Sequence, residues 1–403
     1  MAKQTEIYLD NAATTRCDEE VLSAMTGAFR TDYGNPSSMH RKGFEAQQLM
    51  NSARKTLAGT LRVTPAEILF TSGGTESDNL ALLGCARANA RRGRHLITTS
   101  IEHAAVAKTM EALVQEGFEL TVLPVDSFGL VDPSAAAEAV REDTVLISVM
   151  AVNNEIGSVQ DLPAISRAVR AKKPDVLFHT DAVQAYGKVP IDVKTAGIDL
   201  LSVSGHKFHG PKGCGFLYIR KGVKLLPILY GGGQQNGLRS GTDHVPGAVG
   251  LAAAAGRAFA GQQDTMRRLE ELRDGFIKEV RETTEDIRVN GPAGCLPDDG
   301  SSSFREKAAP HIVSLSFPGV RAEVLLHALE EKGIYVSAGS ACSSHAAKNK
   351  PGTATLRAIG LEERYLESTI RVSLSKDTTK EELHSAACAI AELVPSLRRF
   401  QPG

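Results

Sequence analysis

The sequence lacks the patterns that would place it in several protein classes. Its six cysteines include no CxxC pair, so neither a structural zinc site nor a disulfide framework is indicated. No apolar segment approaches the length of a membrane span, and the first residues, MAKQTEIYLDN, contain no secretory signal. We therefore expect a protein of the reducing cytoplasm with no membrane partner.

Neither sign of charge dominates the chain. Lys and Arg number 46 against 47 Asp and Glu, and the net charge of -1 gives no electrostatic reason to expect nucleic acid as a partner. Apolar residues make up 42% and charged residues 23%, which is typical of a globular protein. The 403 residues suit one large domain plus a smaller one.

Short apolar runs alternate with helical patterns between about residues 66 and 220; the runs are EILFTS, HLITTS, TVLISVMAV, DVLFHTD, LLSVSG and GCGFLYI. This alternation predicts an α/β fold with a large, mostly parallel sheet covered by helices on both faces. Ligands of such sheets bind beyond the carboxyl ends of the strands. After a glycine-rich stretch at 231–241, a helical pattern at 246–283 leads into a second, smaller α/β domain.

Polar or glycine-rich segments follow several of these runs. Gly74 and Thr75 open a predicted helix after the first run, and a helix N-terminus attracts anions. Thr75 and Asp78 also fit a capping box. His103 and Asn154 follow two further runs. Taken alone, each of these segments also fits an ordinary structural role, such as a capped helix or a turn.

Two ionisable residues stand at the ends of neighbouring runs. Asp181 follows DVLFHT, where a carboxylate could meet a cation, although a helix N-cap would serve as well. Lys207 lies in SGHKFHGPKG, which favours neither helix nor strand, and a partly desolvated lysine can act as a Schiff-base amine. The two are 26 residues apart, about one strand–crossover–strand step. Asp181 and Lys207 match the pyridinium nitrogen and the aldehyde of pyridoxal phosphate (PLP), and the predicted helix N-terminus at Gly74 and Thr75 matches its phosphate.

A single cysteine occupies an unusual place. Cys342 lies in SAGSACSSH, and the residues that follow (348–352, KNKPG) predict a mobile loop. A thiol near His and Lys can be partly ionised and therefore nucleophilic, although without the other motifs it would be an idle surface cysteine. Arg371 begins the run RVSLS and could bind a carboxylate, or be an ordinary surface arginine. We interpret the other five cysteines as structural or incidental.

Eight motifs carry a resemblance to a known family: YLDNAATT (8–15), FTSGGTES (70–77), EH (102–103), VNNEIG (152–157), HTDAVQ (179–184), SGHKFHGPKG (204–213), RSGT (239–242) and GSACSS (339–344). In this order they resemble the cysteine desulfurases, which belong to the aminotransferase class V branch of the fold-type I PLP enzymes. The resemblance covers nearly the whole chain, and SGHKFHGPKG and GSACSS are its most specific marks.

The resemblance implies a fold-type I PLP-dependent transferase. Residues 16–260 would form the large PLP-binding domain, and residues 1–15 with 261–403 the small domain that carries the Cys342 loop. It also implies a homodimer with sites at the interface, because Thr242 would reach the phosphate bound by the neighbouring subunit.

The resemblance implies roles for single residues as well. Lys207 would form the Schiff base with PLP, and Cys342 would take the sulfur of L-cysteine as a persulfide. His103 would stack on the ring and assist proton transfer, while Asn154 and Arg371 would bind the substrate. The implied cofactor contacts are Gly74, Thr75, His103, Asn154, Asp181, Gln184, Ser204, His206, Lys207 and Thr242.

The loop after Cys342 leaves the sulfur acceptor open. It looks a few residues longer than in common family members and carries His345, Lys348 and Lys350. The acceptor could be an iron–sulfur scaffold, a tRNA-thiolation protein or another carrier. No intrinsic metal is expected, although Cys342 could ligate an iron–sulfur cluster transiently. Two alternatives remain: a selenocysteine lyase or other class V transaminase or lyase, and a non-catalytic protein on the same fold.

Overall fold

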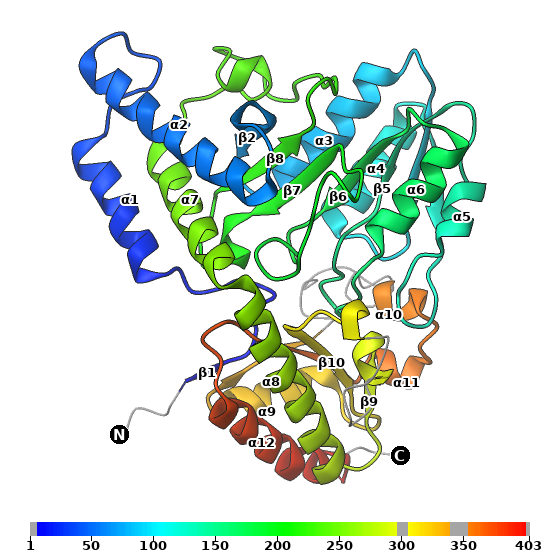
Figure 1. Ribbon diagram of the computed structural model, residues 1–403. Coiled ribbons are helices and arrows are strands. Elements are labelled where there is room, and N and C mark those ends of the chain that lie inside the picture. The colour runs from blue at the N-terminus through cyan, green and yellow to red at the C-terminus, as the bar shows by residue number, and fades with distance from the viewer. Residues whose placement is uncertain (1–5, 296–304, 339–353, 400–403) are drawn as a thin grey trace.

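The computed structural model describes residues 6–295, 305–338 and 354–399. These residues form a large domain and a smaller one, drawn at the top and bottom of Figure 1. The largest element is a seven-stranded sheet with the order β2-β8-β7-β6-β5-β3-β4. Its strands are β2 (Ile68–Thr71), β3 (His95–Thr99), β4 (Glu119–Leu123), β5 (Thr144–Ser148), β6 (Leu177–Asp181), β7 (Leu200–Ser204) and β8 (Gly215–Ile219).

The sheet is mostly parallel, as predicted. Only β8 runs antiparallel to its neighbours, β2 and β7. The strand β4 was not among the predicted runs. It lies at the edge of the sheet, and its residues before Leu123 are exposed or only partly buried, so its sequence, Glu119–Leu123, contains no continuous apolar run.

Helices cover both faces of the sheet. On one face lie α3 (Gly74–Asn89) and α4 (Ala104–Gln115), and on the other lie α2 (Arg41–Leu61), α6 (Leu162–Lys172) and α7 (Val245–Ala260). Neighbouring strand residues enter opposite cores: Leu146 packs with α3 and α4, and Ile147 packs on the other side. Both faces are therefore apolar, which explains the uninterrupted runs. The helix α1 (Glu19–Thr31) packs on α7, and α5 (Pro133–Glu138) packs on α6.

The small domain contains an antiparallel sheet with the order β12-β13-β10-β9. Its strands are β9 (Arg288–Asn290), β10 (Ile312–Ser316), β12 (Ser337–Ala338) and β13 (Thr369–Ser373), and its helices are α8 (Gln262–Thr283), α9 (Ala322–Glu331), α10 (Ala354–Ala358), α11 (Glu363–Leu366) and α12 (Lys380–Arg398). The strand β1 (Ile7–Tyr8) pairs with β11 (Ile334–Tyr335), and Leu9 enters the small-domain core. Short 3₁₀ helices are η1 (Pro65–Glu67), η2 (Gly205–Lys207), η3 (Gln235–Gly237), η4 (Pro292–Cys295) and η5 (Arg305–Lys307).

The helical pattern at 246–283 is two helices rather than one. Gly261 stands between α7 and α8 with a non-helical backbone, which glycine adopts at little cost. We propose that the domain boundary lies here, at 260/261, and that the N-terminal segment 1–15 belongs to the small domain. Within the described residues, no helix combines the length and the apolar character that crossing a bilayer requires.

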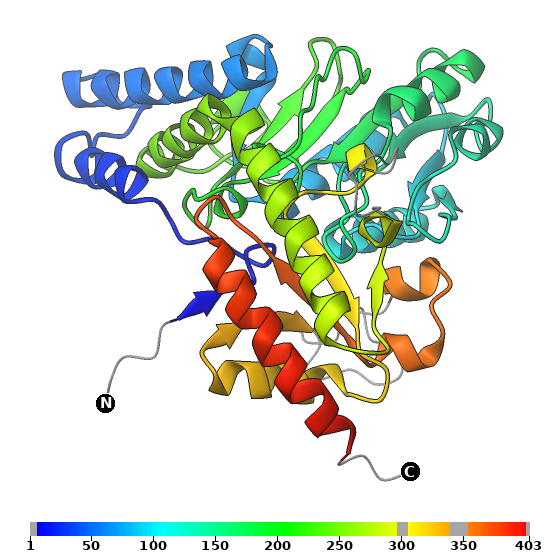
Figure 2. The same ribbon diagram turned by 60° about the horizontal axis from the view of Figure 1, so that its bottom comes forward.

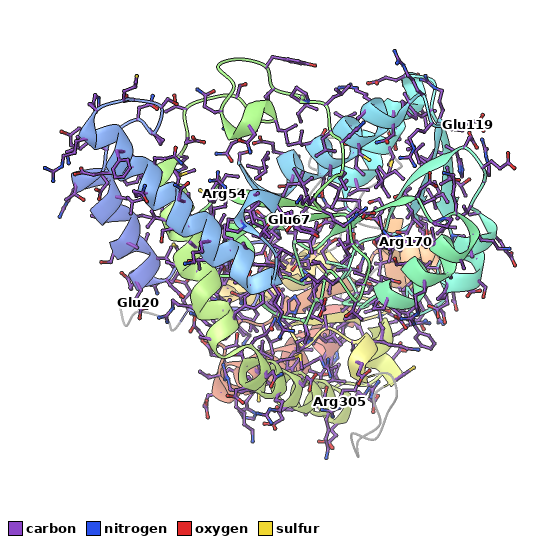
Figure 3. The ribbon with its side chains drawn as sticks, turned by 45° about the horizontal axis from the view of Figure 1, so that its top comes forward. Glu20, Arg54, Glu67, Glu119, Arg170 and Arg305 are labelled. Atoms are coloured by element: carbon purple, nitrogen blue, oxygen red, sulfur yellow. The ribbon has the colours of Figure 1, made fainter. Side chains whose placement is uncertain are left out.

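A buried carboxylate joins the two central strands of the large sheet. Asp199 is 0% exposed and accepts hydrogen bonds from the Phe178 backbone and from the guanidinium groups of Arg170 and Arg220. Arg170 projects from α6 and is labelled in Figure 3. Replacing Asp199 by alanine removes the acceptor from three donors, so we expect the free energy of unfolding to fall by about 3 kcal/mol in urea denaturation.

The control for this variant is Asp175→Ala. Asp175 pairs with Lys173 and Arg92, but its side chain is 57% exposed. Solvent weakens such pairs, so this variant should lose less than about 1 kcal/mol. Equal losses of unfolding free energy for the two variants would show that the burial of Asp199 does not determine how much it stabilises the fold.

Candidate active site

Five strands of the large sheet end at the same edge, and each is followed by a predicted site segment. The carboxyl ends of β2, β3, β5, β6 and β7 point the same way, because β2 and β7 both run antiparallel to β8. Asp181 ends β6, and Lys207 follows β7, its direct parallel neighbour. The predicted strand–crossover–strand relation between these two residues is therefore present.

The amine of Lys207 is held by the N-terminal segment. Its Nζ donates to the carbonyl oxygens of Ala12 and Ala13, at 2.7 and 2.8 Å. Gln184 Nε2 donates to the same Ala12 oxygen at 2.8 Å. Thr15 binds the carbonyl of His206 through its backbone and its hydroxyl. The motif at residues 8–15 thus fixes the lysine loop through backbone atoms.

Two buried carboxyl groups, those of Asp181 and Asp78, are close enough to influence each other, and Asp181 also interacts with Lys207. Burial raises the pKa of Asp181, while the nearby side chains of His103 and Lys207 act to lower it. Burial, and then the negative charge of Asp181, raises the pKa of Asp78 well above its usual value. The Asp78 Oδ1 atom has no hydrogen-bond partner among the described residues. A pair of carboxyl groups in these surroundings suits a cationic ligand, such as a pyridinium nitrogen.

The position of Asp78 corrects one prediction. Thr75 and Asp78 do not form a capping box, because the N-cap of α3 is Gly73 and no side chain caps it. Asp78 instead points inward and is 1% exposed, with its Oδ1 atom 3.5 Å from His179 Nε2. Asp78 lies on the side of α3 that faces the sheet, so its carboxyl group points away from the N-terminus of the helix.

The start of α3 forms a cradle with the end of β7. Gly73 has a φ of +151°, and a Cβ on Gly74 would lie 2.7 Å from Val183 Cγ2, so both positions require glycine. Ser204 lies beside both glycines. The first N–H groups of a helix have no acceptor within it. These donors and the Ser204 hydroxyl fit a phosphate, while Thr75 is exposed at the same turn.

Two histidines border this edge, one partly buried and one exposed. Burial, followed by the charge of Lys207, lowers the pKa of His206 to about 4, so its ring is neutral, and its Nδ1 lies 3.1 Å from Thr14 Oγ1. His103 is exposed and caps α4, with Nδ1 accepting from the Ala105 N–H at 3.1 Å. Glu102 braces this turn by accepting from the Met150 backbone N–H, and burial raises its pKa to about 8.

Arg371 brings the small domain to the same edge. Its guanidinium donates to the Asn154 carbonyl oxygen at 2.9 Å and to Asp10 Oδ1 at 2.8 Å. Its Nε atom is buried without a partner among the described residues. The predicted substrate residues, Asn154 and Arg371, are therefore in direct contact although they come from different domains.

Cys342 lies outside the described residues, but both ends of its segment are placed. On one side, β12 pairs with β13, and Ser337 is the register partner of Arg371. On the other side, Thr355 is buried and its side chain lies close to that of Glu155, the residue after Asn154. Cys342 is four residues beyond Ala338, a span of at most about 14 Å. Chain length therefore allows Cys342 to approach Arg371.

Several residues of this site could not be identified from the sequence alone. Ala12 and Ala13 act through carbonyl oxygens, which any residue carries. Asp10 lies in the YLDNAATT motif, but only the fold brings it to Arg371. Lys188 donates to Gln184 Oε1 at 3.3 Å, and burial, followed by the charges of Lys207 and Arg371, lowers its pKa to about 7. Its spacing of four from Gln184 was visible in the sequence; its burial was not.

Thr242 makes no side-chain hydrogen bond with the other predicted cofactor residues in the part of the chain that the structure describes. It is exposed, in the loop that Arg239 fastens to α3 through an ion pair with Glu76. The other site residues bring together the Lys207 amine, the buried Asp181 carboxylate, the glycine-lined N-terminus of α3 and the Arg371 guanidinium. This set fits PLP together with an amino-acid substrate.

Comparison with known proteins agrees with this chemistry. The chain matches the aminotransferase class-V family over residues 7–385. It is 42% identical over 397 residues to the cysteine desulfurase IscS of Dictyoglomus turgidum, which covers 98% of this chain and 96% of the relative. It is 43% identical over 396 residues to the cysteine desulfurase IscS of Methanosarcina thermophila, with coverage of 98% and 94%.

Solved structures give the same result. A NifS-like protein superposes with a TM-score of 0.88 at 39% identity, covering 97% of this chain and all of its own. A structure of SspA in complex with cysteine superposes with a TM-score of 0.77 at 34% identity, covering 93% of this chain and 100% of that one. The predicted family, fold class and cofactor are confirmed. The chain belongs to the aminotransferase class-V family of PLP enzymes, and within it to the cysteine desulfurases.

Proposed function

We propose that this enzyme releases L-alanine from L-cysteine and holds the sulfur as a persulfide on Cys342. One observation carries the proposal: the Lys207 amine, the buried Asp181 and the Arg371 guanidinium gather at one sheet edge, and the Cys342 segment begins beside Arg371, where Ser337 is its register partner. An amine, a cation-binding carboxylate, a carboxylate-binding arginine and a thiol within reach are the groups that cysteine desulfuration requires.

We propose the cofactor contacts that the family resemblance implies, and the arrangement of the sheet edge supports them. When bound, PLP acts as an electron sink for the carbanion chemistry of amino acids. Asp181 would pair with the pyridine nitrogen and Gln184 with the ring hydroxyl, while His103 would cover the ring. The phosphate would lie on the cradle, together with Thr242 of the neighbouring subunit; the cradle residues are Gly74, Thr75, Ser204 and His206. Asn154 would contact both the cofactor and the substrate.

Lys207 would move the Cα proton of cysteine. A lysine amine can act as a base only after losing its own proton, and positive neighbours favour that loss. The Ala12 and Ala13 carbonyls accept from Nζ and therefore set its direction. Lys207 is partly exposed and belongs to the lining of a cavity between the domains.

Arg371 would bind the carboxylate of the substrate. Its planar guanidinium can hold a carboxylate through two parallel hydrogen bonds, and its buried Nε still lacks an acceptor. The Asn154 carbonyl and the Asp10 carboxylate accept from its two terminal nitrogens and together fix its plane. The substrate would then lie between Lys207 and the segment that carries Cys342.

The thiolate of Cys342 would attack the sulfur of the bound cysteine, so that the S–S bond forms as the C–S bond breaks. We further propose that the enzyme is a cytoplasmic homodimer that delivers sulfur to an acceptor protein, such as an iron–sulfur scaffold or a tRNA-thiolation carrier. Cys342 would then serve as a transient ligand of an iron–sulfur cluster on the acceptor. The basic residues Lys348 and Lys350 favour an acidic docking face on that acceptor.

The test is incubation of the holoenzyme with L-cysteine, followed by mass measurement of its cysteine peptides. We expect the Cys342 peptide to gain one sulfur atom, matched by release of alanine. The peptides of the exposed Cys295 and Cys388 are internal controls and should gain none. A sulfur atom on one of those peptides, with Cys342 unmodified, would contradict the proposal.

A further inference from the structure

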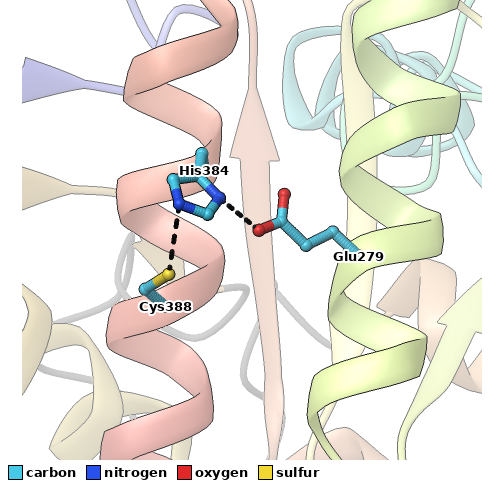
Figure 4. Close-up of side chains that lie close together, drawn as sticks. All are labelled: Glu279, His384 and Cys388. Atoms are coloured by element: carbon cyan, nitrogen blue, oxygen red, sulfur yellow. Dashed lines mark hydrogen bonds and ion pairs between the residues drawn. The ribbon is translucent and has the colours of Figure 1, made fainter.

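A second group of chemically reactive side chains lies far from the cofactor edge. The helices α8 and α12 pack side by side on the outside of the small domain (Figure 2). His384 and Cys388 are four residues apart on α12 and therefore share one face. Glu279 faces them from α8 (Figure 4). His384 Nδ1 pairs with Glu279 Oε1, and His384 Nε2 lies 3.7 Å from Cys388 Sγ.

These three residues supply the ligand types of a zinc site. One ligand atom from each lies within 4.8 Å of the others. Thiolate sulfur, imidazole nitrogen and carboxylate oxygen bind Zn²⁺ at about 2.0–2.3 Å, with water in the remaining position. The side chains of His384 and Glu279 are 65% and 30% exposed, and Cys388 is exposed as well. Small rotations of exposed side chains would therefore bring the three atoms to one ion.

We propose that Glu279, His384 and Cys388 bind one Zn²⁺ ion that ties α12 to α8. The imidazole binds the ion through one nitrogen, so its present contacts with the carboxylate and the thiol are replaced by shared ligation of the metal. A mixed sulfur, nitrogen and oxygen set favours zinc over the hard cations Mg²⁺ and Ca²⁺.

In a second cluster in the described part of the chain, basic side chains already compensate the negative charge, so it needs no metal ion. Asp18, His209 and Asp377 also gather within ligand distance. The carboxylate of Asp18, however, accepts hydrogen bonds from Lys376 and Arg257, which compensate its charge. That cluster also lacks a soft ligand. At the α8–α12 group, by contrast, the partner of Glu279 is His384, itself a prospective ligand.

Zinc at this site has two physical consequences. An ion that binds only the folded protein raises its stability in proportion to the logarithm of the metal concentration. The ion also holds the Cys388 sulfur as a bound thiolate, which hides it from alkylating and oxidising reagents. Both effects concern the small domain and need no substrate.

The experiment uses the holoenzyme with Cys342→Ala, which removes the thiol proposed to carry sulfur. Titration with Co²⁺, a coloured substitute for zinc, should give one bound ion per chain with thiolate–cobalt absorption that Zn²⁺ abolishes. His384→Ala, Cys388→Ser and Glu279→Gln should each weaken this binding, the first two to the point of losing the thiolate–cobalt absorption. Zinc should also slow alkylation of the Cys388 peptide by iodoacetamide.

Two variants serve as matched controls. His327 is exposed on α9, where it pairs with Glu330. His327→Ala and Cys295→Ser should both leave the cobalt signal unchanged. Absence of cobalt binding in the parent protein would overturn the proposal. A cobalt signal that survives His384→Ala would overturn it equally, because the ion would then lie elsewhere.

Discussion

Replacing Lys207 by alanine is expected to abolish cysteine turnover. The side chain performs two tasks in the proposed mechanism, since it attaches the cofactor and removes the Cα proton of the substrate. Loss of a positioned base alone costs about 10²- to 10⁴-fold, and loss of covalent attachment adds to it. We expect alanine release to fall about ten-thousandfold or more in steady-state assays at saturating cysteine.

Lys212→Ala is the matched control. Lys212 lies in the same loop but is exposed, and it should retain activity within a few-fold of the parent enzyme. Borohydride reduction followed by peptide mass measurement gives a readout that does not depend on turnover. The cofactor should be trapped on the Lys207 peptide in the parent and in Lys212→Ala, and on no peptide of Lys207→Ala. Alanine release by Lys207→Ala within tenfold of the parent would refute the assignment of the base.

The large sheet could be predicted because its strands are buried on both faces. Leu146 and Ile147 enter different cores, so β5 is an unbroken apolar run in the sequence. The edge strand β4 has no such run and escaped prediction. The break at Gly261 escaped as well, because one glycine inside a long helical pattern is equally compatible with a continuous helix.

The positions of Asp181 and Lys207 could be predicted for a related reason. Residues that follow parallel strands meet at one sheet edge, whatever the details of the loops. Contacts made by backbone oxygens could not be predicted, since Ala12 and Ala13 carry no side-chain signal. Asp78, by contrast, carries a side-chain signal in the sequence, but that signal predicted the wrong role. Its spacing from Thr75 fits a capping box, but α3 begins earlier and turns Asp78 toward the sheet.

Cys342→Ser should separate sulfur transfer from cofactor binding. Serine keeps the size and polarity of the side chain but is a much poorer nucleophile toward sulfur than a thiolate. The cofactor absorbance should therefore persist, because the residues proposed to hold PLP, such as Lys207 and Asp181, are unchanged. We expect alanine release from cysteine to fall by more than about a thousandfold, since a nucleophile lost from a concerted site is not replaced by its neighbours.

The controls are Cys295→Ser and Cys388→Ser, which remove two exposed thiols and should leave alanine release unchanged. Titrating the variants with cysteine and recording the cofactor band adds a second readout, because Cys342→Ser should still bind the substrate. Full alanine release by Cys342→Ser would exclude the persulfide step and favour a lyase that expels sulfur without a protein thiol. Loss of both the band and the activity would point instead to damage at the sheet edge, and the conservative serine makes that outcome the least expected one.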